Sequence, residues 1–260
     1  MTDIVVVKMG GATLGSHDTI IEDLVHLQRE GWKLVVVHGG GRELTQWLNK
    51  LGITTKFVEG ERATDEASLE VATAILAGLV NKEIVAQLNI FGGRAVGLSG
   101  VDGSLISGRP KSKQSGYTGE VEKVDAELLL VLLEAGYMPV ISPISFYPSK
   151  SSPRPLLNIN GDPVAGEIAA AISARKLIFL TDVAGIVDEK GALIPSLSSS
   201  RAEVLLSSGV ISGGMIPKVK ASLKALHSIA SAHIIDGREP HALARELEEG
   251  GYGTVIEEAK

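Results

Sequence analysis

Short runs of aliphatic and β-branched residues alternate along this chain with longer segments that mix apolar and polar positions. Compact apolar runs bounded by turn residues predict buried strands at 3–8, 33–38, 95–98, 138–142, 156–160, 176–182 and 233–235. Apolar positions that recur with a helical period predict helices at 18–30, 42–51, 65–89 (as one helix or two), 126–135, 162–174, around 204–206 and at 215–231. This alternation indicates an α/β protein with a largely parallel central sheet and helices on both faces.

Two segments depart from this alternation. Residues 104–124 are polar and contain several glycines, which predicts a hairpin that projects from the body. Residues 149–155 combine serines with two prolines and predict a break before a second set of strands and helices. We expect Asp162 to cap the helix after this break, with Pro163 at the first helical position. A boundary near residue 172 then divides a single domain, 1–260, into lobes of about 1–172 and 173–260.

The composition is that of a globular protein with a sizeable aliphatic core. Hydrophobic residues make up 44% and charged residues 22% of the 260 residues, whereas aromatic residues are only 4%. The net charge of −6 gives no electrostatic reason to expect nucleic acid or an anionic membrane as a partner. An anionic ligand must therefore be held by a few local cations.

Cysteine is absent, which excludes disulfides, thiolate zinc sites and cysteine nucleophiles. The longest apolar stretch, 126–140, is interrupted by two glutamates and a glycine and is too short to span a bilayer. The sequence opens on a predicted strand rather than on a basic and then apolar signal segment. We therefore expect a cytoplasmic protein.

The first two predicted strands both end in consecutive glycines. One turn reads Lys8-Met-Gly-Gly11 and the other reads His38-Gly-Gly-Gly41. Glycine lets the backbone turn sharply and lets N–H groups approach an anion closely. The helix expected after Gly41 also points its positive N-terminus at this place. Neither turn matches the phosphate-loop or dinucleotide-binding patterns, so together they predict a phosphate site of another kind.

Lys8 and Lys218 are the cations best placed to serve such a site. Lys8 could simply extend into solvent, but it stands near the carboxyl end of a strand, where open α/β sheets bind ligands. Lys218 follows a glycine turn in the first turn of a helix. A cation is disfavoured there unless an anion is shared between it and the helix N-terminus, the alternative being a solvated helix lysine.

Four further residues suit a ligand that carries carboxylate and amide groups. Asn158 and Asn160 fall on one face of a short strand, and their amides can both donate and accept hydrogen bonds. Arg62 is either a loop arginine paired with a nearby glutamate or a bidentate partner for a carboxylate. Asp162 is either a helix cap alone or a residue that orients neighbouring cations.

The histidines do not indicate an acid–base or metal centre. His38 is interpreted as a turn or core histidine rather than a base, and no Ser-His-Asp set is evident. His227, His233 and His241 lack the spacing of metal ligands. The remaining lysines, glycine turns and asparagines favour positioning and charge stabilisation, which is what phosphoryl transfer requires.

Six motifs, in order and well spaced, resemble the amino-acid kinase superfamily over nearly the whole chain. They are Lys8-Met-Gly-Gly11, His38-Gly-Gly-Gly41, Gly60-Glu-Arg-Ala-Thr64, Asn158-Ile-Asn-Gly-Asp162, Thr181-Asp-Val-Ala-Gly-Ile186 and Gly213-Gly-Met-Ile-Pro-Lys218. The resemblance is greatest to the branch that uses ATP to phosphorylate the side-chain carboxylate of N-acetyl-L-glutamate in arginine biosynthesis, giving N-acetylglutamyl 5-phosphate. It implies a three-layer α/β/α sandwich whose N-terminal lobe binds the amino acid and whose C-terminal lobe binds MgATP.

The resemblance also implies a role for each motif. Lys8 and Lys218 would stabilise the transferring phosphoryl group, and Asp162 would organise both lysines. Gly10, Gly11 and Gly40 would offer N–H groups to phosphate oxygens, with Gly41 alongside. Arg62 would grip the substrate α-carboxylate, and Asn158, with Asn160 beside it, would hold the amide region. The nucleotide pocket would be lined by Thr181, Asp182, Val183, Ala184, Gly185, Ile186, Gly209, Val210 and Ile211.

Such a reaction needs no general base. The acceptor is a carboxylate with an ordinary pKa of about 4.3, so it is already ionised at neutral pH. The obstacle is repulsion between this carboxylate and the γ-phosphate, which two lysines and Mg²⁺ would offset. Phosphates and water can hold Mg²⁺, so no protein ligand to the metal is expected.

One alternative is a kinase for aminoadipate or glutamate attached to a small acidic carrier protein. Such a substrate would need a basic surface near the pocket, which Arg109, Lys111 and Lys113 could supply. The motifs at 60–64 and 213–218 look more like those of the enzymes that use the free substrate. An alternative of another class is a non-catalytic amino-acid or nucleotide sensor on the same fold, against which the retained lysines and aspartate argue.

The resemblance bears on assembly as well. Arginine-inhibited members resemble hexamers that are built through an extra N-terminal helix. Lys8 lies too near the first residue for such a helix, although residues 233–243 resemble the region that binds arginine in those members. We expect a homodimer that is insensitive to arginine.

Overall fold

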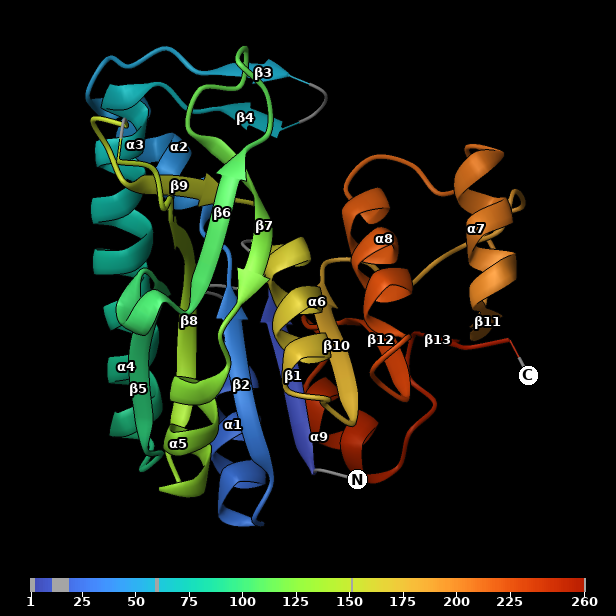
Figure 1. Cartoon of the computed structure of the whole chain (residues 1–260). Coiled ribbons are helices and arrows are strands. Elements are labelled where there is room, and N and C mark those ends of the chain that lie inside the picture. Colours follow the sequence, from blue (N-terminus) through green and yellow to red (C-terminus); the bar gives the residue numbers. More distant parts are fainter. Residues whose placement is uncertain (1–2, 11–18, 59–60, 151, 260) are drawn as a thin grey trace.

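A computed structural model describes residues 3–10, 19–58, 61–150 and 152–259. An 11-stranded mixed sheet runs through this described part in the order β11-β13-β12-β10-β1-β2-β8-β6-β7-β9, with β5 also paired to β8. A separate pair of short strands, β3 and β4, lies beyond one end of the main sheet (Figure 1). The predicted α/β class is confirmed.

The elements have the following bounds. The strands are β1 (Ile4–Met9), β2 (Lys33–His38), β3 (Lys56–Val58), β4 (Glu61–Ala63), β5 (Ala95–Gly100), β6 (Ile106–Pro110), β7 (Thr118–Val124), β8 (Met138–Phe146), β9 (Leu156–Ile159), β10 (Lys176–Thr181), β11 (Ser196–Ser198), β12 (Ser231–Asp236) and β13 (Thr254–Glu257). The helices are α1 (Ile20–Arg29), α2 (Gly41–Lys50), α3 (Glu66–Ala72), the π-helix η1 (Thr73–Val80), α4 (Asn81–Ile90), the short 3₁₀ helix η2 (Asp102–Ser104), α5 (Glu127–Glu134), α6 (Gly161–Ala171), α7 (Ser199–Ser207), α8 (Met215–Ala225) and α9 (Ala242–Glu248).

The centre of the sheet is parallel and covered on both faces. β12, β10, β1, β2, β8 and β5 pair in parallel, and their near-continuous apolar runs suit burial on both sides. One core cluster lies between this sheet and α5, α6, α7 and α8. The other lies between the sheet and α1, η1, α4 and α9. Figure 1 shows these two helical layers on opposite sides of the strands.

The alternation of side chains along β1 and β2 decides which residues reach each layer. Val6 of β1 belongs to the cluster under α6 and α8, whereas Val7 belongs to the cluster under α1 and α4. Because side chains alternate along a strand, Lys8 leaves the sheet on the α6 and α8 side. On β2, Val36 faces the α1 and α4 side, so His38 does too. Lys8 and His38 therefore leave neighbouring strands on opposite faces.

Helices α6 and α8 pack unusually closely. A Cβ atom at Gly166 of α6 would lie 2.9 Å from the Ala221 carbonyl oxygen and 3.1 Å from the Ala221 Cβ of α8. Asp162 precedes Gly166 by four residues and Lys218 precedes Ala221 by three, so each lies on the same stripe as the contact residue of its helix. The glycine contact thus brings Asp162 and Lys218 to the same end of the helix pair.

Two sequence expectations are wrong. Residues 104–124 do not project from the body, because β6 pairs with β8 and β7 pairs with β9 within the main sheet. The glycines there, read as turn signals, allow close packing instead: a Cβ at Gly119 would lie 2.8 Å from Leu157. The cap of α6 is Asn160, whose side chain accepts from the Asp162 N–H, and not Asp162. Pro163 consequently falls at the third helical position rather than the first.

Other boundaries differ less. The helix expected at 215–231 ends at Ala225, and β8 continues to Phe146, beyond the expected 142. The pair β3–β4, the edge strand β11, its neighbour β13, and helix α9 were not predicted. All five are three to seven residues long, too short for a clear hydrophobic period. Among the described helices, none combines the length and the apolar character that a membrane span needs.

The close approach of α6 and α8 can be tested with two glycines of helical conformation. Gly166→Ala is expected to lower the free energy of unfolding by about 1–3 kcal/mol, because the new methyl group presses on the backbone of Ala221. Gly78→Ala is the control, since a Cβ there meets nothing within 4 Å and alanine favours the helix. Urea unfolding of both variants measures the difference, and equal effects would contradict this account.

Candidate active site

Four parallel strands end side by side on one edge of the sheet. Met9 of β1 lies in register with Leu180 of β10 and with His38 of β2, and Thr181 of β10 lies in register with Asp236 of β12. The glycine turn after β2 and the turn at 182–186 after β10 therefore leave the sheet at the same edge. In an open α/β sheet, this carboxyl edge is where ligands bind.

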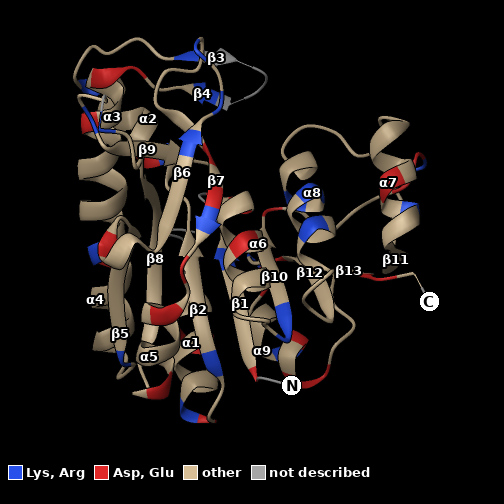
Figure 2. Ribbon diagram, viewed as in Figure 1, with Lys and Arg blue, Asp and Glu red and all other residues tan. Residues whose placement is uncertain are grey.

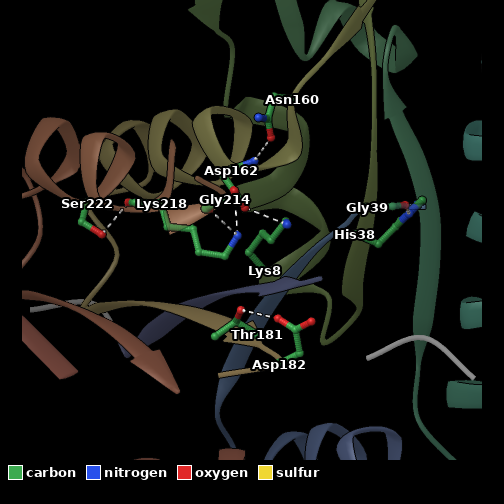
Figure 3. A network of polar contacts seen from close by, with 10 residues as sticks. All are labelled: Lys8, His38, Gly39, Asn160, Asp162, Thr181, Asp182, Gly214, Lys218 and Ser222. Carbon is green, nitrogen blue, oxygen red and sulfur yellow. Dashed lines mark hydrogen bonds and ion pairs between the residues drawn. The ribbon is translucent and has the colours of Figure 1, made fainter. Parts of the chain in front are cut away.

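At this edge one carboxylate holds two lysines. The Lys8 Nζ lies 2.7 Å from the Asp162 Oδ1, and the Lys218 Nζ lies 3.0 Å from the Asp162 Oδ2. Figure 3 shows both lysine side chains reaching the same carboxylate, Lys8 from β1 and Lys218 from α8. The side chains of Lys8, Asp162 and Lys218 are only 8%, 4% and 12% exposed. We call these three residues the lysine–aspartate cluster.

Local structure fixes the carboxylate. Asp162 is the second residue of α6, and its N–H donates to the Asn160 side-chain oxygen at 3.0 Å. Gly161 leaves room for this arrangement, because a Cβ there would lie 3.3 Å from the His38 carbonyl oxygen and 3.4 Å from the Lys8 Cε. Lys218 also donates to the Gly214 carbonyl oxygen at 3.4 Å, which steadies its ammonium group.

Burial and ion pairing act in opposite directions on the charged groups of the cluster. Burial raises the pKa of Asp162, but the charges of Lys8 and Lys218 and their hydrogen bonds outweigh it and bring this pKa below 3.8. Burial lowers the pKa of Lys8, the Asp162 carboxylate opposes that effect, and the charge of Lys218 adds to it. Two ammonium groups and one carboxylate leave a net positive charge at the sheet edge, which favours an anionic ligand.

The turn Gly39–Gly41 depends on glycine at its centre. Gly40 has φ of 139°, and a Cβ there would lie 2.6 Å from the Leu76 Cδ2. The Gly39 N–H donates to the Met9 carbonyl oxygen at 3.0 Å, which ties the turn to β1. Helix α2 starts at Gly41, so its first N–H groups have no partner within the helix and face the same edge.

The first glycine turn, after β1, is tied to β10. The Gly10 N–H donates to the Leu180 carbonyl oxygen at 3.2 Å, because β1 continues its pairing with β10 for one residue more. In this structure that N–H is engaged within the sheet, and a contact of Gly10 with phosphate stays a prediction. Its missing side chain still matters, since a Cβ would lie 3.0 Å from the same carbonyl oxygen. Gly11 lies outside the described residues.

Arg62 lies on β4, away from the lysine–aspartate cluster along the chain. Its guanidinium donates to the Thr55 Oγ1 at 2.7 Å and to the Thr45 Oγ1 at 2.6 Å. Partial burial lowers the pKa of Arg62 from its ordinary value, although the group stays charged in the physiological range. The Thr118 hydroxyl donates to the Arg62 carbonyl oxygen at 2.6 Å and so fixes β4 against β7.

Asn158 and Asn160 make different contacts. The Asn158 Nδ2 donates to the Thr64 Oγ1 at 3.2 Å, and Thr64 is adjacent to β4. Asn158 therefore joins the main sheet to the segment that carries Arg62. The Asn160 side-chain oxygen is occupied by capping α6, so only its amide NH₂ group is left to donate to a ligand.

The residues expected at the nucleotide split into an exposed and a buried set. Thr181 ends β10, and Asp182, Val183 and Ala184 are exposed beyond it. Ile186 and Ile211 belong to the hydrophobic core and are each 2% exposed, so they support this region from beneath. Gly185, with φ of 150°, packs against Thr254. Gly209 and Val210 lie between α7 and Ile211; Gly209 is exposed, and Val210 packs against the same core.

A cleft of about 970 Å³ opens beside the lysine–aspartate cluster, between β7 on one side and α6 and α8 on the other. Its charged lining includes Lys220 and Lys224 of α8, together with Lys111 just after β6. Figure 2 shows basic positions on α8 and on β6, on either side of α6. Glu120 and Glu167 also line the cleft, and Glu167 pairs with Lys224, so Lys111 and Lys220 are the basic side chains that add to the charge of the cluster. Its full lining is Lys111, Gly119, Glu120, Val121, Ile159, Asn160, Asp162, Pro163, Gly166, Glu167, Gly213, Gly214, Ile216, Pro217, Lys218, Lys220, Ala221 and Lys224.

Comparison with known proteins agrees with these features. The model of the amino acid kinase family matches residues 3–236. The chain belongs to the amino acid kinase family. It is 51% identical to the acetylglutamate kinase of Dehalococcoides mccartyi, over 97% of this chain and 94% of that protein. It is 47% identical to the acetylglutamate kinase of a Nostoc species, over 97% of this chain and 86% of that protein. Among solved structures, smu.665 from Streptococcus mutans superposes over all of both chains with a TM-score of 0.85 and 26% identity.

Membership of the amino acid kinase family makes the protein a kinase and accounts for the composition of the site. The lysine–aspartate cluster and the glycine turns supply positive charge and N–H donors, which are the groups that phosphoryl transfer uses. Among the described residues, no group of three His, Cys, Asp or Glu side chains is arranged to hold a metal ion.

His38 is confirmed as a buried core histidine. It is fully buried, and its Nδ1 donates to the Gly39 carbonyl oxygen at 2.7 Å. Asn81, which sequence reasoning missed, donates from its Nδ2 to the His38 Nε2 at 3.1 Å. The signal for Asn81 was present, since it is an amide within the apolar helical run that continues into Ile84 and Leu88. Burial lowers the pKa of His38 to about 4, and the charges of Lys8 and Lys82 add to this effect.

The lowered pKa of His38 predicts a pH dependence of stability. In the unfolded chain the residue takes up a proton near pH 6.5, whereas the folded protein resists protonation until about pH 4. The contribution of neutral His38 is therefore complete above pH 6.5 and is lost as the pH falls toward 4. The loss approaches about 3 kcal/mol.

Urea unfolding at several pH values between 7.5 and 4.5 checks this prediction. His38→Asn provides the control, because asparagine cannot titrate and the other titratable groups of the protein are unchanged. The slope of unfolding free energy against pH should be shallower in the variant than in the wild type. Parallel slopes would show that His38 titrates normally in the folded protein.

Proposed function

We propose that this protein is an acetylglutamate kinase, which transfers the γ-phosphoryl group of ATP to the side-chain carboxylate of N-acetyl-L-glutamate in arginine biosynthesis. The observation that carries this proposal is the lysine–aspartate cluster at the strand ends of a chain that is half identical to acetylglutamate kinases. The product would be the acyl phosphate N-acetylglutamyl 5-phosphate.

The two lysines would neutralise charge as the phosphoryl group moves between two anionic oxygens. Lys8 and Lys218 are held on opposite oxygens of one carboxylate, so their ammonium groups are separated yet aimed at a common region. Asp162 would keep both in place and would not touch the substrate. Preorganised cations of this kind act in the transition state without reorganising. The acceptor carboxylate is ionised at neutral pH, so no base is needed.

The substrate would lie on the side of β4 and β9. Arg62 would pair with the α-carboxylate, and its two threonine contacts already hold the guanidinium in one orientation. Asn158 would meet the amide region of the N-acetyl group, with the NH₂ of Asn160 beside it. Gly40 and Gly41 would border the transferring phosphoryl group and the substrate.

ATP would lie over the strand ends of the C-terminal half. Thr181–Ile186 and Gly209–Ile211 would border the nucleotide, with their exposed members in contact and the two isoleucines in support. Mg²⁺ would be held by the phosphates of ATP and by water, since the described residues contain no group of three His, Cys, Asp or Glu side chains that could hold a metal ion. The metal would offset charge on the phosphate oxygens.

We also propose that the chain works as two lobes, about 1–172 and 173–260. This boundary falls between α6 and β10, and β1 joins the two halves by pairing with β2 on one side and β10 on the other. Asp162 and Lys218 would then belong to different lobes, so that their ion pair spans the junction.

A hydroxamate-trapping assay tests the function, since hydroxylamine captures an acyl phosphate. With MgATP we expect rapid trapping with N-acetyl-L-glutamate and little with glutamate, aminoadipate or their carrier-linked forms. Preference for a carrier-linked substrate would replace the proposal with the carrier-protein kinase. Nucleotide binding without any trapped product would indicate a sensor instead.

In the same assay, Lys8→Arg and Lys218→Arg are each expected to lose about 10²–10³-fold in kcat. Arginine keeps the charge but cannot place a compact ammonium group on the Asp162 carboxylate. Circular dichroism should show that both variants fold. Lys33→Arg, at the opposite end of β2, is the matched control and should keep wild-type turnover. Near-normal turnover by a folded Lys8→Arg protein would remove the assigned role.

We further propose a cytoplasmic homodimer that arginine does not inhibit. The proposal follows from the resemblance noted in the sequence and from the absence of cysteine. Light scattering of the purified protein measures its mass in solution. A hexamer, or inhibition of the kinase by arginine, would overturn this proposal.

A further inference from the structure

A second polar network lies on the other face of the sheet from the lysine–aspartate cluster. His38 points toward α4, where its Nδ1 and Nε2 have different partners. The Nδ1 lies 2.7 Å from the Gly39 carbonyl oxygen, which can only accept. The Nε2 lies 3.1 Å from the Asn81 Nδ2. All of these residues are among those that the structure describes.

The partners of Asn81 identify its amide nitrogen. The Nδ2 also lies 2.9 Å from the Val140 carbonyl oxygen and 3.3 Å from the Leu98 carbonyl oxygen, and both of these groups accept. The Oδ1 accepts from the Lys82 Nζ at 3.0 Å. The group that faces the His38 Nε2 is therefore a donor, so the Nε2 carries no proton. His38 is neutral with its proton on Nδ1, and that proton goes to Gly39.

The hydrogen bond from the His38 Nδ1 fixes the orientation of the peptide group between Gly39 and Gly40. A trans peptide is planar, and its C=O and N–H point in opposite directions. When His38 holds the Gly39 carbonyl on the α4 side, the N–H of Gly40 in the same peptide points away from it. No described residue accepts from that N–H. His38 ends β2, which pairs with β1, the strand that carries Lys8.

The surrounding packing leaves little freedom for this arrangement. Asn81 directly follows the π-helix η1, and Leu76 and Val80 of η1 press on Gly40, where a Cβ would meet them at 2.6 Å and 3.5 Å. On the other side, a Cβ at Gly97 of β5 would lie 2.1 Å from the Asn81 Oδ1. π-helical segments often occur at functional sites. Here the π-helix places two aliphatic side chains against the glycine turn, and the residue after it places an amide beside His38.

We propose that Asn81 and His38 are positioning residues that fix the Gly39–Gly40 peptide so that the Gly40 N–H donates to the phosphoryl group during its transfer. This inference rests on the proposed kinase function of the same site. Asn81 selects the tautomer of His38, and the Nδ1–H of that tautomer holds the Gly39 carbonyl on the α4 side. The Gly40 N–H, in the same peptide, therefore points away from the α4 side. Neither side chain touches the substrate.

A purely structural role for the network predicts a different result. If His38 only fills space, variants at this position should lose activity in proportion to their loss of stability. If it positions a donor, activity should follow the hydrogen bond to Gly39. The Nδ2 of asparagine is as many bonds from the backbone as the histidine Nδ1, and the Nε2 of glutamine is as many as the histidine Nε2.

The decisive experiment compares His38→Asn with His38→Gln in the full-length protein. We expect His38→Gln to lose about 10²-fold in kcat with little change in either KM, because one transition-state donor is lost. His38→Asn keeps a donor for Gly39 and should retain turnover within about 10-fold of the wild type. MgADP with aluminium fluoride mimics the phosphoryl group during transfer. Its affinity should fall more in His38→Gln than in His38→Asn.

Equal kcat losses in the two variants, or losses that follow their urea unfolding midpoints, would overturn the proposal. A loss confined to KM would overturn it as well.

Nitrogen NMR of the wild-type protein supplies a readout that does not depend on the substrate. Long-range ¹H–¹⁵N spectra should show His38 with a protonated Nδ1 and an unprotonated Nε2 between pH 6 and 8. The opposite tautomer would overturn the proposal even if the protein is the proposed kinase. Asn81→Leu should lower the Nδ1–H population together with kcat. If that variant does not fold, the His38 pair still decides the question.

If the wild-type enzyme fails the hydroxamate assay, the proposed function fails while the tautomer remains measurable. A correct tautomer with equal turnover in both His38 variants would instead leave the kinase intact and remove the positioning role.

Discussion

The site depends on one buried carboxylate that holds two ammonium groups from distant parts of the chain. Asp162 sits at the start of α6, Lys8 at the end of β1 and Lys218 in α8. Removing one partner from a buried ion pair typically costs about 3–5 kcal/mol, because the remaining charge is left without compensation. The cluster therefore requires β1, α6 and α8 to meet in one arrangement. The same requirement leaves one positive charge in excess at the sheet edge, where an anion is to be received.

The packing of the protein meets this requirement with small residues. Gly166 lets α6 approach α8, Gly161 lets the helix start close to Lys8 and the end of β2, and Gly40 accommodates the side chains of η1. At each of these positions a Cβ would lie within 3.4 Å of a neighbouring atom. Glycines in a sequence therefore predict loops at some positions where the structure instead uses them for close packing. The glycines at 108 and 119, which were taken as signs of a projecting hairpin, are of this kind.

The site is also divided between the two faces of the sheet. Charge lies on the α6 and α8 side, and the neutral network of His38 and Asn81 lies on the α4 side. Strand alternation makes this division, because Lys8 and His38 end neighbouring parallel strands with opposite orientations. Buried amides and a neutral imidazole suit the α4 side, since a protonated His38 would be repelled by Lys8 and Lys82.

The sequence by itself determined the fold class, the strand–helix alternation, the carboxyl edge with its glycine turns, and the lysines and aspartate proposed for the site. These features are local: hydrophobic period, glycine after a strand and a lysine in the first turn of a helix are all read within a few residues. Only the tertiary structure decided which groups are already engaged. The Gly10 N–H is taken by Leu180 of β10, and the Asn160 oxygen caps α6. Asn81 meets His38 across 43 positions of sequence. Such pairings depend on how strands and helices pack, and residues far apart in the chain carry no local signal of their contact.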